Sequence, residues 1–350
     1  MEKRKLGTTD IEVSSICLGT MTWGQQNTQD EGFEQMDYAL DMGINFFDTA
    51  EMYAVPPKKE TQGSTEKIIG NWFNERKNRD KVILATKVCG RAPFTWLRDD
   101  EKPTEQNKKQ IFEAVDKSLE RLQTDYIDLY QLHWPNRGSY HFRQNWNYDP
   151  SSQKTKPIIS EIELLVDTLF KLKKEGKIRA FGLSNETSWG TMQFVLATKK
   201  YKDFNVVSIQ NEYSLLCRHF DTDLSELSHN ENIPLLAYSP LAAGLLTGKY
   251  INNKIPKNSR LSRVHDLGGR FNSRTILAIK EYLNLSKQHN LELIELALAF
   301  CNQRKFMGSV IFGSTSLKQL KLILSAIKLK INEKVINEIN SIYKNNPLTF

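Results

Sequence analysis

Residues 44–53 read INFFDTAEMY, and this stretch decides the fold expected for the whole chain. A short apolar run between Gly43 and polar turn residues is typical of a buried parallel strand. Asp48 then lies where the strand ends. In parallel α/β folds, ligands bind and reactive side chains project at that carboxyl end. Other strands that end in polar side chains would complete a site at the same edge.

The composition is that of a soluble globular protein. The chain has 350 residues, of which 39% are hydrophobic and 25% charged, so it holds one large domain or two ordinary ones. The 48 basic and 41 acidic residues give a net charge of +7, spread along the chain. Spread charge favours a solvated lysine-rich surface over a nucleic-acid-binding block, and an anionic ligand would need only a few of these residues.

The cysteines and the N-terminal sequence indicate a cytoplasmic protein. Cys17, Cys89, Cys217 and Cys301 are far apart and form no C-x-x-C pair, as expected for reduced thiols. The first residues lack an apolar signal core, and no apolar run approaches the ~18 residues of a membrane helix. No His and Cys cluster has the spacing of metal ligands, so we expect neither a metal nor a membrane partner.

Apolar strands alternate with helical patterns along most of the chain. Residues 4–13 predict a hairpin around a turn at 7–10. Eight strands are expected, at 16–18, 44–48, 82–87, 127–133, between Gly176 and Asn185, and at 206–210, 235–238 and 310–312. Between them we expect a helix from an N-cap at Asp30 to Gly43, one near 64–76, one around 111–122, and one with a capping box at Ser160 and Glu163. Two further helices are expected at 274–289 and 291–303.

This pattern predicts a (β/α)8 TIM barrel that forms a single domain over residues 1–350, with an N-terminal β-hairpin. The alternative is a doubly wound sheet, but residues 19–24 (GTMTWG) do not match its G-x-G-x-x-G turn. Long loops at 134–158 and 245–273 are predicted lids or clamps at the C-terminal face, and disordered segments are the alternative. A helical stretch at 331–344 would cover the barrel or a partner, which leaves a homo-oligomer open.

Three consecutive strands end in Asp48, Lys87 and His133, and Tyr53 follows the first of them. In a barrel these ends converge on one mouth. A neighbouring ammonium would lower the pKa of the tyrosine and make it a usable general acid. Taken singly, each residue fits a cap, a strand end, a core histidine or simple packing. Taken together at one face, the four favour a catalytic site.

Three motifs carry a family resemblance: residues 43–53, the ATKV of 85–88 and the LYQLHW of 129–134. They resemble the aldo-keto reductase superfamily. Residues 55–63 are similar to its Tas-like branch, which is related more distantly to the beta subunits of voltage-gated potassium channels. The resemblance implies reduction of a small aldehyde or ketone with NADP(H). Tyr53 would protonate the carbonyl, Lys87 would lower its pKa, Asp48 would anchor Lys87, and His133 would orient the substrate.

The same resemblance implies cofactor and substrate residues. Ser184, Asn185 and Gln210 would hold the nicotinamide carboxamide, and Tyr238 would stack on the ring. The other expected cofactor residues are Thr20, Met21, Asp48, the pyrophosphate clamp Ser239, Leu241 and Lys249, then Arg260 at the 2'-phosphate, and Gly313, Thr315 and Gln319 at the adenosine phosphate. Trp23, Tyr53 and Trp134 would line the substrate pocket.

One departure and two rival hypotheses remain open. Leu322 and Ile323 stand where related proteins often carry polar adenine contacts, which weakens the expected preference for NADPH over NADH. The chain could instead be a nucleotide-sensing auxiliary subunit with slow turnover. In a third interpretation Lys87 is a Schiff-base nucleophile in an aldolase-like barrel.

Overall fold

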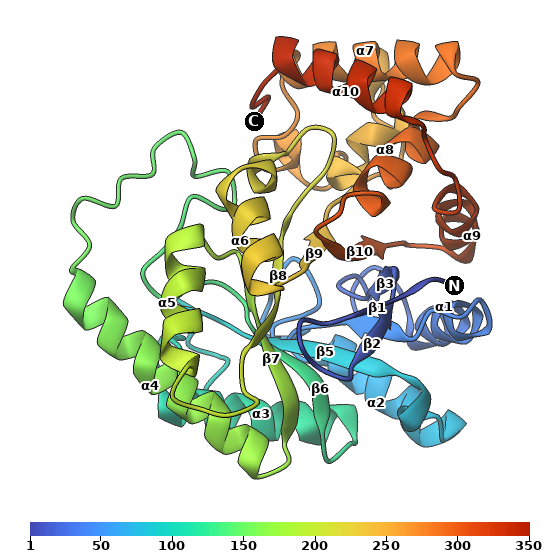
Figure 1. Cartoon of the computed structure of the whole chain (residues 1–350). Coiled ribbons are helices and arrows are strands. Elements are labelled where there is room, and N and C mark those ends of the chain that lie inside the picture. The colour runs from blue at the N-terminus through green and yellow to red at the C-terminus, as the bar shows by residue number, and fades with distance from the viewer.

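Eight parallel strands close into a barrel (Figure 1). The computed structural model describes residues 1–350, except for the side chain of Asn253. In barrel order the strands are β10 (Met307–Gly313), β3 (Ile16–Gly19), β4 (Phe46–Asp48), β5 (Ile83–Val88), β6 (Ile127–Leu132), β7 (Ile178–Ser184), β8 (Val206–Glu212) and β9 (Leu235–Tyr238). All eight predicted strands belong to it, so the (β/α)8 prediction is confirmed.

Helices surround the barrel, and two of them pack together outside this ring. They are α1 (Gln29–Asp41), α2 (Ser64–Arg76), α3 (Lys108–Leu122), α4 (Thr155–Lys174), α5 (Ser188–Thr198), α6 (Asp223–Glu231), α7 (Ser273–Gln288), α8 (Leu293–Asn302), α9 (Leu317–Ala326) and α10 (Glu333–Asn345). The predicted extra pair is present as α7 and α8. Helix α10 packs against α7, side by side at the top of Figure 1. None of the described helices is long and apolar enough to cross a bilayer.

The N-terminal hairpin closes the bottom of the barrel. Strands β1 (Lys3–Lys5) and β2 (Glu12–Ser14) pair antiparallel, as predicted. Leu6, Ile11 and Val13 are buried in one cluster with side chains from the barrel strands, such as Phe46 and Leu129. Burying these apolar groups stabilises the fold and leaves the opposite, C-terminal face as the open end.

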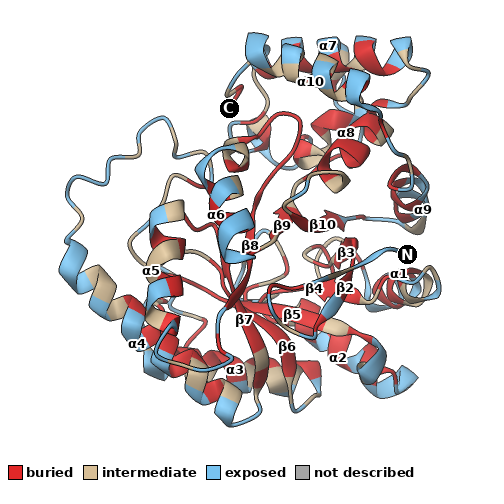
Figure 2. Cartoon of the chain, in the orientation of Figure 1, coloured by how far each residue is buried: buried red, intermediate tan, exposed pale blue. Residues whose placement is uncertain are grey.

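The core lies between the outer wall of the barrel and the helices (Figure 2). Strands are buried along nearly their whole length, whereas the helices expose their outer faces. Near-continuous apolar strands are expected when a parallel sheet is covered on both sides. The polar residues buried at strand ends are therefore exceptions to the pattern, and they gather at the mouth.

Two predicted helix starts are wrong. Helix α1 is capped by Thr28, which forms a capping box with Glu31, rather than by Asp30. Helix α4 begins at Thr155, so Ser160 lies inside it and caps nothing. Pro157 falls in its first turn, where the missing N–H has no helical acceptor to lose. The loop before α4 is correspondingly shorter and spans residues 133–154.

This 133–154 loop, called the strap below, is tied down across the C-terminal face. The hydroxyl of Ser139 donates to the carbonyl of Asn185 at 2.9 Å. Arg137 forms a bidentate pair with Glu186, and His141 Nε2 bonds the carbonyl of Glu186 at 3.0 Å. These contacts join the strap to the loop after β7, and its role as a lid or clamp stays a prediction.

Candidate active site

A buried lysine joins the end of β4 to the loop that follows it. Lys87 on β5 is fully buried, and its ammonium donates to Asp48 Oδ2 at 2.6 Å and to the carbonyl of Thr49 at 2.7 Å. The hydroxyl of Tyr53 lies 3.5 Å from the same nitrogen. The structure thus brings together three of the four predicted catalytic residues, as expected for neighbouring strand ends of a barrel.

Two glutamines fix the other oxygen of Asp48. Gln131 Nε2 donates to Oδ1 at 3.1 Å and Gln210 Nε2 donates at 2.8 Å. Gln210 also donates to Gln131 Oε1 at 3.1 Å. Gln131 was missed in the sequence, although it stands two positions before His133 and a strand directs alternate side chains to the same face. A fully bonded carboxylate is held in one orientation toward Lys87.

The electrostatics of the pair differ from the sequence-based expectation. Burial acts to lower the pKa of Lys87, but the charges of Asp48 and Tyr53 and the hydrogen bonds to them together outweigh it, so the net shift of the pKa is upward and the ammonium is retained. Burial also raises the pKa of Tyr53, and Lys87 offsets this only in part. The expected lowering of the Tyr53 pKa is therefore wrong as a net direction. Tyr53 therefore stays a protonated phenol and can donate its proton.

His133 stands beside Tyr53 as a neutral imidazole. The two ring centroids are 6.0 Å apart, in an edge-on arrangement. Burial, followed by the charge of Lys87, places the pKa of His133 well below its ordinary value. A neutral imidazole carries one N–H, so His133 can donate a single hydrogen bond to an oxygen in the mouth.

Trp134 forms a partly exposed wall next to His133. Its ring centroid is 4.8 Å from that of His133, and its indole N–H donates to the carbonyl of Arg91 at 3.2 Å. Gly90 permits this approach, because a Cβ there would lie 2.1 Å from the carbonyl oxygen of Trp134. Tyr53 and Trp134 thus both lie beside His133, and their role in a substrate pocket stays a prediction.

Trp23 lies elsewhere. Its ring is fully buried and packs against α1, where a Cβ on Gly32 would lie 3.3 Å from it. A large apolar ring is more stable in the layer between barrel and helices than at an open mouth, and the predicted pocket role of Trp23 is corrected. Of its neighbours, Thr20 donates its hydroxyl to the carbonyl of Asp48 at 2.9 Å, and the carbonyl of Met21 accepts from Val55.

The residues expected around a nicotinamide form a connected polar row. Asn185 Nδ2 donates to the carbonyl of His133 at 2.8 Å, and Asn185 Oδ1 accepts from the hydroxyl of Tyr238 at 2.7 Å. Ser184 donates to the carbonyl of Gln210 at 2.9 Å. Among the described residues no donor reaches Gln210 Oε1, which leaves that oxygen free to accept from an amide.

The residues expected to bind the cofactor phosphates make fewer hydrogen bonds within the protein. Ser239, at φ 54°, and the partly exposed Leu241 follow β9, and the partly exposed Lys249 lies against the ring of Tyr250. Arg260 is exposed, and its guanidinium has no bonded partner among the described side chains. A cation without a partner fits an anionic ligand better than it fits a structural role.

The loop between β10 and α9 has some of the features of an anion-binding site. Gly313 is exposed, and the chain then enters α9, where Ser316 caps the helix. Helix N-termini present free N–H groups to anions. However, the side chain of Gln319 accepts from Thr315, so both are occupied with one another. Ile323 is buried in the core and only Leu322 is exposed, so the two do not contact a ligand as a pair.

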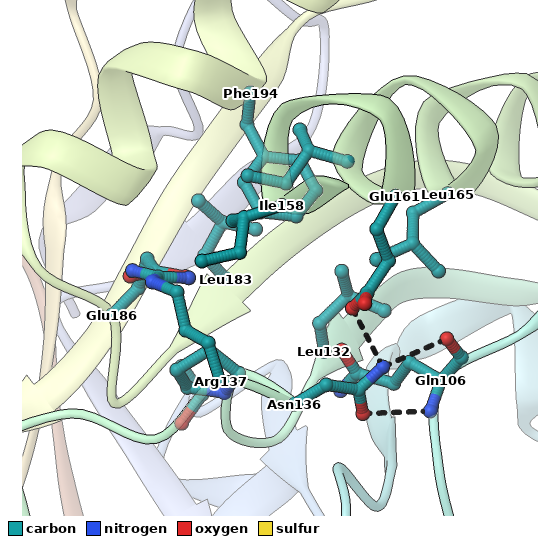
Figure 3. Close-up of a pocket in the computed structure, with 13 residues that line it drawn as sticks. Gln106, Leu132, Asn136, Arg137, Ile158, Glu161, Leu165, Leu183, Glu186 and Phe194 are labelled. Carbon is teal, nitrogen blue, oxygen red and sulfur yellow. Dashed lines mark hydrogen bonds and ion pairs between the residues drawn. The ribbon is translucent and has the colours of Figure 1, made fainter. Parts of the chain in front are cut away.

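A small cavity lies behind the strap, and its size and bonding do not suit a substrate. Figure 3 shows it between the strap and α4, with Asn136 bonded to Gln106 and Glu161. Its volume of about 10 Å³ is close to what one water molecule needs. Asn136, Gln106 and Glu161 satisfy one another, so this cavity supports the strap rather than a substrate.

The strap also contains a buried histidine that predicts an acid-sensitive stability. Burial lowers the pKa of His141 to about 4, against the upward effects of its bond to Glu186 and of the Glu212 charge. The unfolded chain takes up this proton below its ordinary pKa of about 6.5, while the folded chain does not, so stability falls as the pH falls from 6.5 toward 4. We expect His141→Gln to remove roughly 3 kcal/mol of this loss.

Urea unfolding at a series of pH values measures the effect. His265→Gln is the matched control, because His265 is exposed and its substitution should leave the pH dependence unchanged. Parallel curves for the wild type and His141→Gln would show that the buried histidine does not set the acid limit.

No group of three or more His, Cys, Asp or Glu side chains with metal-binding geometry occurs among the described residues. All four cysteines are buried and unpaired, which agrees with the expected reduced thiols.

Comparison with known proteins agrees with this geometry. The model of the aldo/keto reductase family matches residues 15–344. The chain is 39% identical over 350 residues to Protein tas of Escherichia coli (strain K12), with 98% of each chain covered. It is 38% identical to an aldo-keto reductase of Babesia bovis over 75% of this chain and 96% of that one. It is 30% identical to the oxidoreductase YrpG of Bacillus subtilis (strain 168) over 98% and 96% of the two chains. The chain therefore belongs to the aldo/keto reductase family of oxidoreductases.

Proposed function

We propose that this oxidoreductase reduces an aldehyde or ketone to the alcohol with NADPH, and that Tyr53 is the proton donor. The observation that carries the proposal is the buried Lys87, held by Asp48 with its ammonium 3.5 Å from the hydroxyl of Tyr53. Residues 1–350 would act as one barrel domain, since the four groups come from strands that only a closed barrel brings together. When bound, the nicotinamide supplies the hydride.

The charges around Tyr53 and Lys87 explain how Tyr53 would donate its proton. Tyr53 is protonated at rest because burial raises its pKa. When the hydroxyl donates its proton to a carbonyl oxygen, the Lys87 ammonium stabilises the phenolate that forms. His133 is neutral and donates its one N–H to the same oxygen, which orients the carbonyl. Tyr53, Lys87 and His133 can therefore act from the positions that they occupy in the structure.

Lys87 is not placed to act as a Schiff-base nucleophile. A nucleophilic lysine must lose its proton, whereas the net shift of the Lys87 pKa is upward. Its nitrogen also has three oxygen neighbours, in Asp48, Thr49 and Tyr53. These contacts favour a permanent ammonium, and they favour the reductase over the aldolase-like alternative.

The residues present fit a nicotinamide dinucleotide. Gln210 Oε1 is free to accept from a carboxamide, and Tyr238 is partly exposed at the mouth. Ser239, Leu241 and Lys249 would hold the pyrophosphate, and Gly313 with the start of α9 would hold the adenosine phosphate. Arg260 is the residue that we assign to the 2'-phosphate, on the strength of its exposed and unbonded guanidinium.

This assignment predicts a cofactor preference that depends on Arg260. We expect Arg260→Ala to weaken NADPH binding by about 10- to 100-fold, the worth of a charge-assisted hydrogen bond, and to leave NADH binding nearly unchanged. Quenching of tryptophan fluorescence in titrations with each cofactor measures both constants. Arg263→Ala, a neighbouring exposed arginine, is the matched control. Equal losses for the two cofactors would remove Arg260 from the 2'-phosphate.

The function itself is tested by the loss of reduced-nicotinamide absorbance. Purified protein is mixed with NADPH and each member of a set of aromatic and aliphatic aldehydes and dicarbonyls. Turnover of at least one carbonyl that disappears in Tyr53→Phe supports the proposal. Tight NADPH binding without turnover of any of them would favour a nucleotide-sensing subunit.

A further inference from the structure

Beyond the four catalytic groups, the mouth holds a second cluster of charged side chains. Glu212 at the end of β8 is paired with Arg270 through both oxygens, at 2.7 Å and 2.8 Å. Arg143 of the strap approaches the same carboxylate at 3.5 Å. Neither arginine was singled out in the sequence, since both lie in long irregular segments.

The cluster contains more positive charge than it can neutralise. Arg270 already uses both oxygens of Glu212, so Arg143 is left with one long contact. The Nε of Arg143 is buried and has no partner among the described residues. Two guanidinium groups against one carboxylate leave one positive charge unbalanced, and burial together with the charge of Arg270 lowers the pKa of Arg143. A partly desolvated guanidinium with one long contact to a shared carboxylate is costly unless an anion binds it.

Arg143 borders a small cavity that could receive such a group. The cavity has a volume of about 20 Å³, more than one water molecule needs. Its polar lining includes His141, Asn211, Glu212 and His219 beside Arg143, while Phe142 and Phe350 supply apolar walls. Desolvation lowers the pKa of the buried His141 and of the partly buried His219, so neither adds positive charge near neutral pH.

The cluster faces the same opening as the catalytic groups. Gln210, bonded to Asp48, and Glu212 are two positions apart on β8, so their side chains share one face, and Glu212 lies about 7 Å nearer the mouth. From the other side, the ring of Phe142 packs on Trp134 at 6.1 Å, and Trp134 packs on His133. A ligand that reaches from His133 toward the strap therefore meets Arg143.

We propose that Arg143, supported by the Arg270–Glu212 pair, is an anion subsite that binds a carboxylate carried by the carbonyl substrate. The substrate class is thus an aldehyde or ketone with an acidic group a few bonds from the carbonyl. Arg143 offers the paired N–H geometry that carboxylates prefer. This inference rests on the proposed reductase function for its kinetic part and is independent of it for its binding part.

A matched pair of substrates tests the kinetic part. 4-Formylbenzoate and its methyl ester differ in charge but share one ring and one aldehyde. We expect Arg143→Met to lower the ratio of their kcat/KM values by about 10- to 100-fold, and Arg143→Lys to restore part of it. Arg91→Met is the control, since Arg91 lies in a neighbouring loop with its side chain exposed. An unchanged ratio in Arg143→Met overturns the proposal.

A binding measurement separates this proposal from the reductase function. Calorimetric titration of 4-(hydroxymethyl)benzoate into the protein with NADPH measures binding without turnover, because the alcohol and the reduced cofactor cannot exchange a hydride. Weaker binding to Arg143→Met than to the wild type and Arg91→Met supports the subsite even if no aldehyde is reduced. If Arg143→Met weakens NADPH instead and leaves the benzoate unaffected, Arg143 serves a cofactor phosphate and the proposal fails. The absence of benzoate binding to the wild type also overturns it.

Discussion

Tyr53→Phe is expected to lower kcat by about 100- to 10,000-fold, the usual contribution of a positioned general acid. The substitution removes one hydroxyl that lies 3.5 Å from the Lys87 ammonium. It leaves the ring, and with it the edge-on packing against His133 at 6.0 Å. The loss should therefore appear in kcat rather than in the stability of the fold. Steady-state consumption of NADPH with an aromatic aldehyde measures it.

Binding of NADPH should survive this substitution. The hydroxyl acts on the substrate oxygen, so removing it takes away an interaction made in the transition state and leaves ground-state binding of the cofactor unchanged. Fluorescence titration with NADPH provides that comparison. Tyr148→Phe is the matched control, because the hydroxyl of Tyr148 lies on the strap and accepts only from Gln153. Full activity in Tyr53→Phe would exclude it as the acid.

The barrel was predictable because its signals are local and repeated. Each strand is a short apolar run, and each is separated from the next by a helical period, so the eight units could be counted along the chain. Helix starts were less predictable. Ser160 and Glu163 have the spacing of a capping box, but the apolar face of α4 continues one turn before them and the helix extends back to Thr155. Tertiary packing decided that boundary, not the cap.

The convergence of Asp48, Tyr53 and Lys87, which we propose to be catalytic, was predictable from their places at or after strand ends, whereas the groups that hold them were not. Gln131 lies within the LYQLHW motif but was given no role, Arg98 belongs to no motif, and the contacts of both depend on which segments the barrel brings together. Burial was also invisible in the sequence. The pKa of Tyr53 rises because desolvation exceeds the effect of Lys87, and Trp23 lies in the core because α1 covers it. The spacing of residues along the chain predicts which side chains come together, but it does not predict how far each one is buried from solvent.

A large loss of stability is expected when the loop that carries Tyr53 loses its buried ion pair. Glu51, two positions before Tyr53, is buried and accepts from both Nη atoms of Arg98 at 2.8 Å and 2.9 Å. It also accepts from the backbone N–H of Cys89 at 2.8 Å. These bonds tie the loop after β4 to the loop after β5. Arg98→Met would leave the Glu51 carboxylate buried without a cation, at a cost of about 3–5 kcal/mol in the free energy of unfolding.

The double variant Glu51→Gln with Arg98→Met separates the buried charge from the lost contact. A glutamine oxygen can still accept from Cys89, and no unpaired charge remains, so most of the stability should return. Urea unfolding of the two single variants and the double variant measures the coupling. Arg91→Met, which removes an exposed pair with Glu105, should cost no more than about 1 kcal/mol. If the double variant is as unstable as Arg98→Met, the loss comes from packing around Arg98, and the ion pair is not what holds Tyr53 in place.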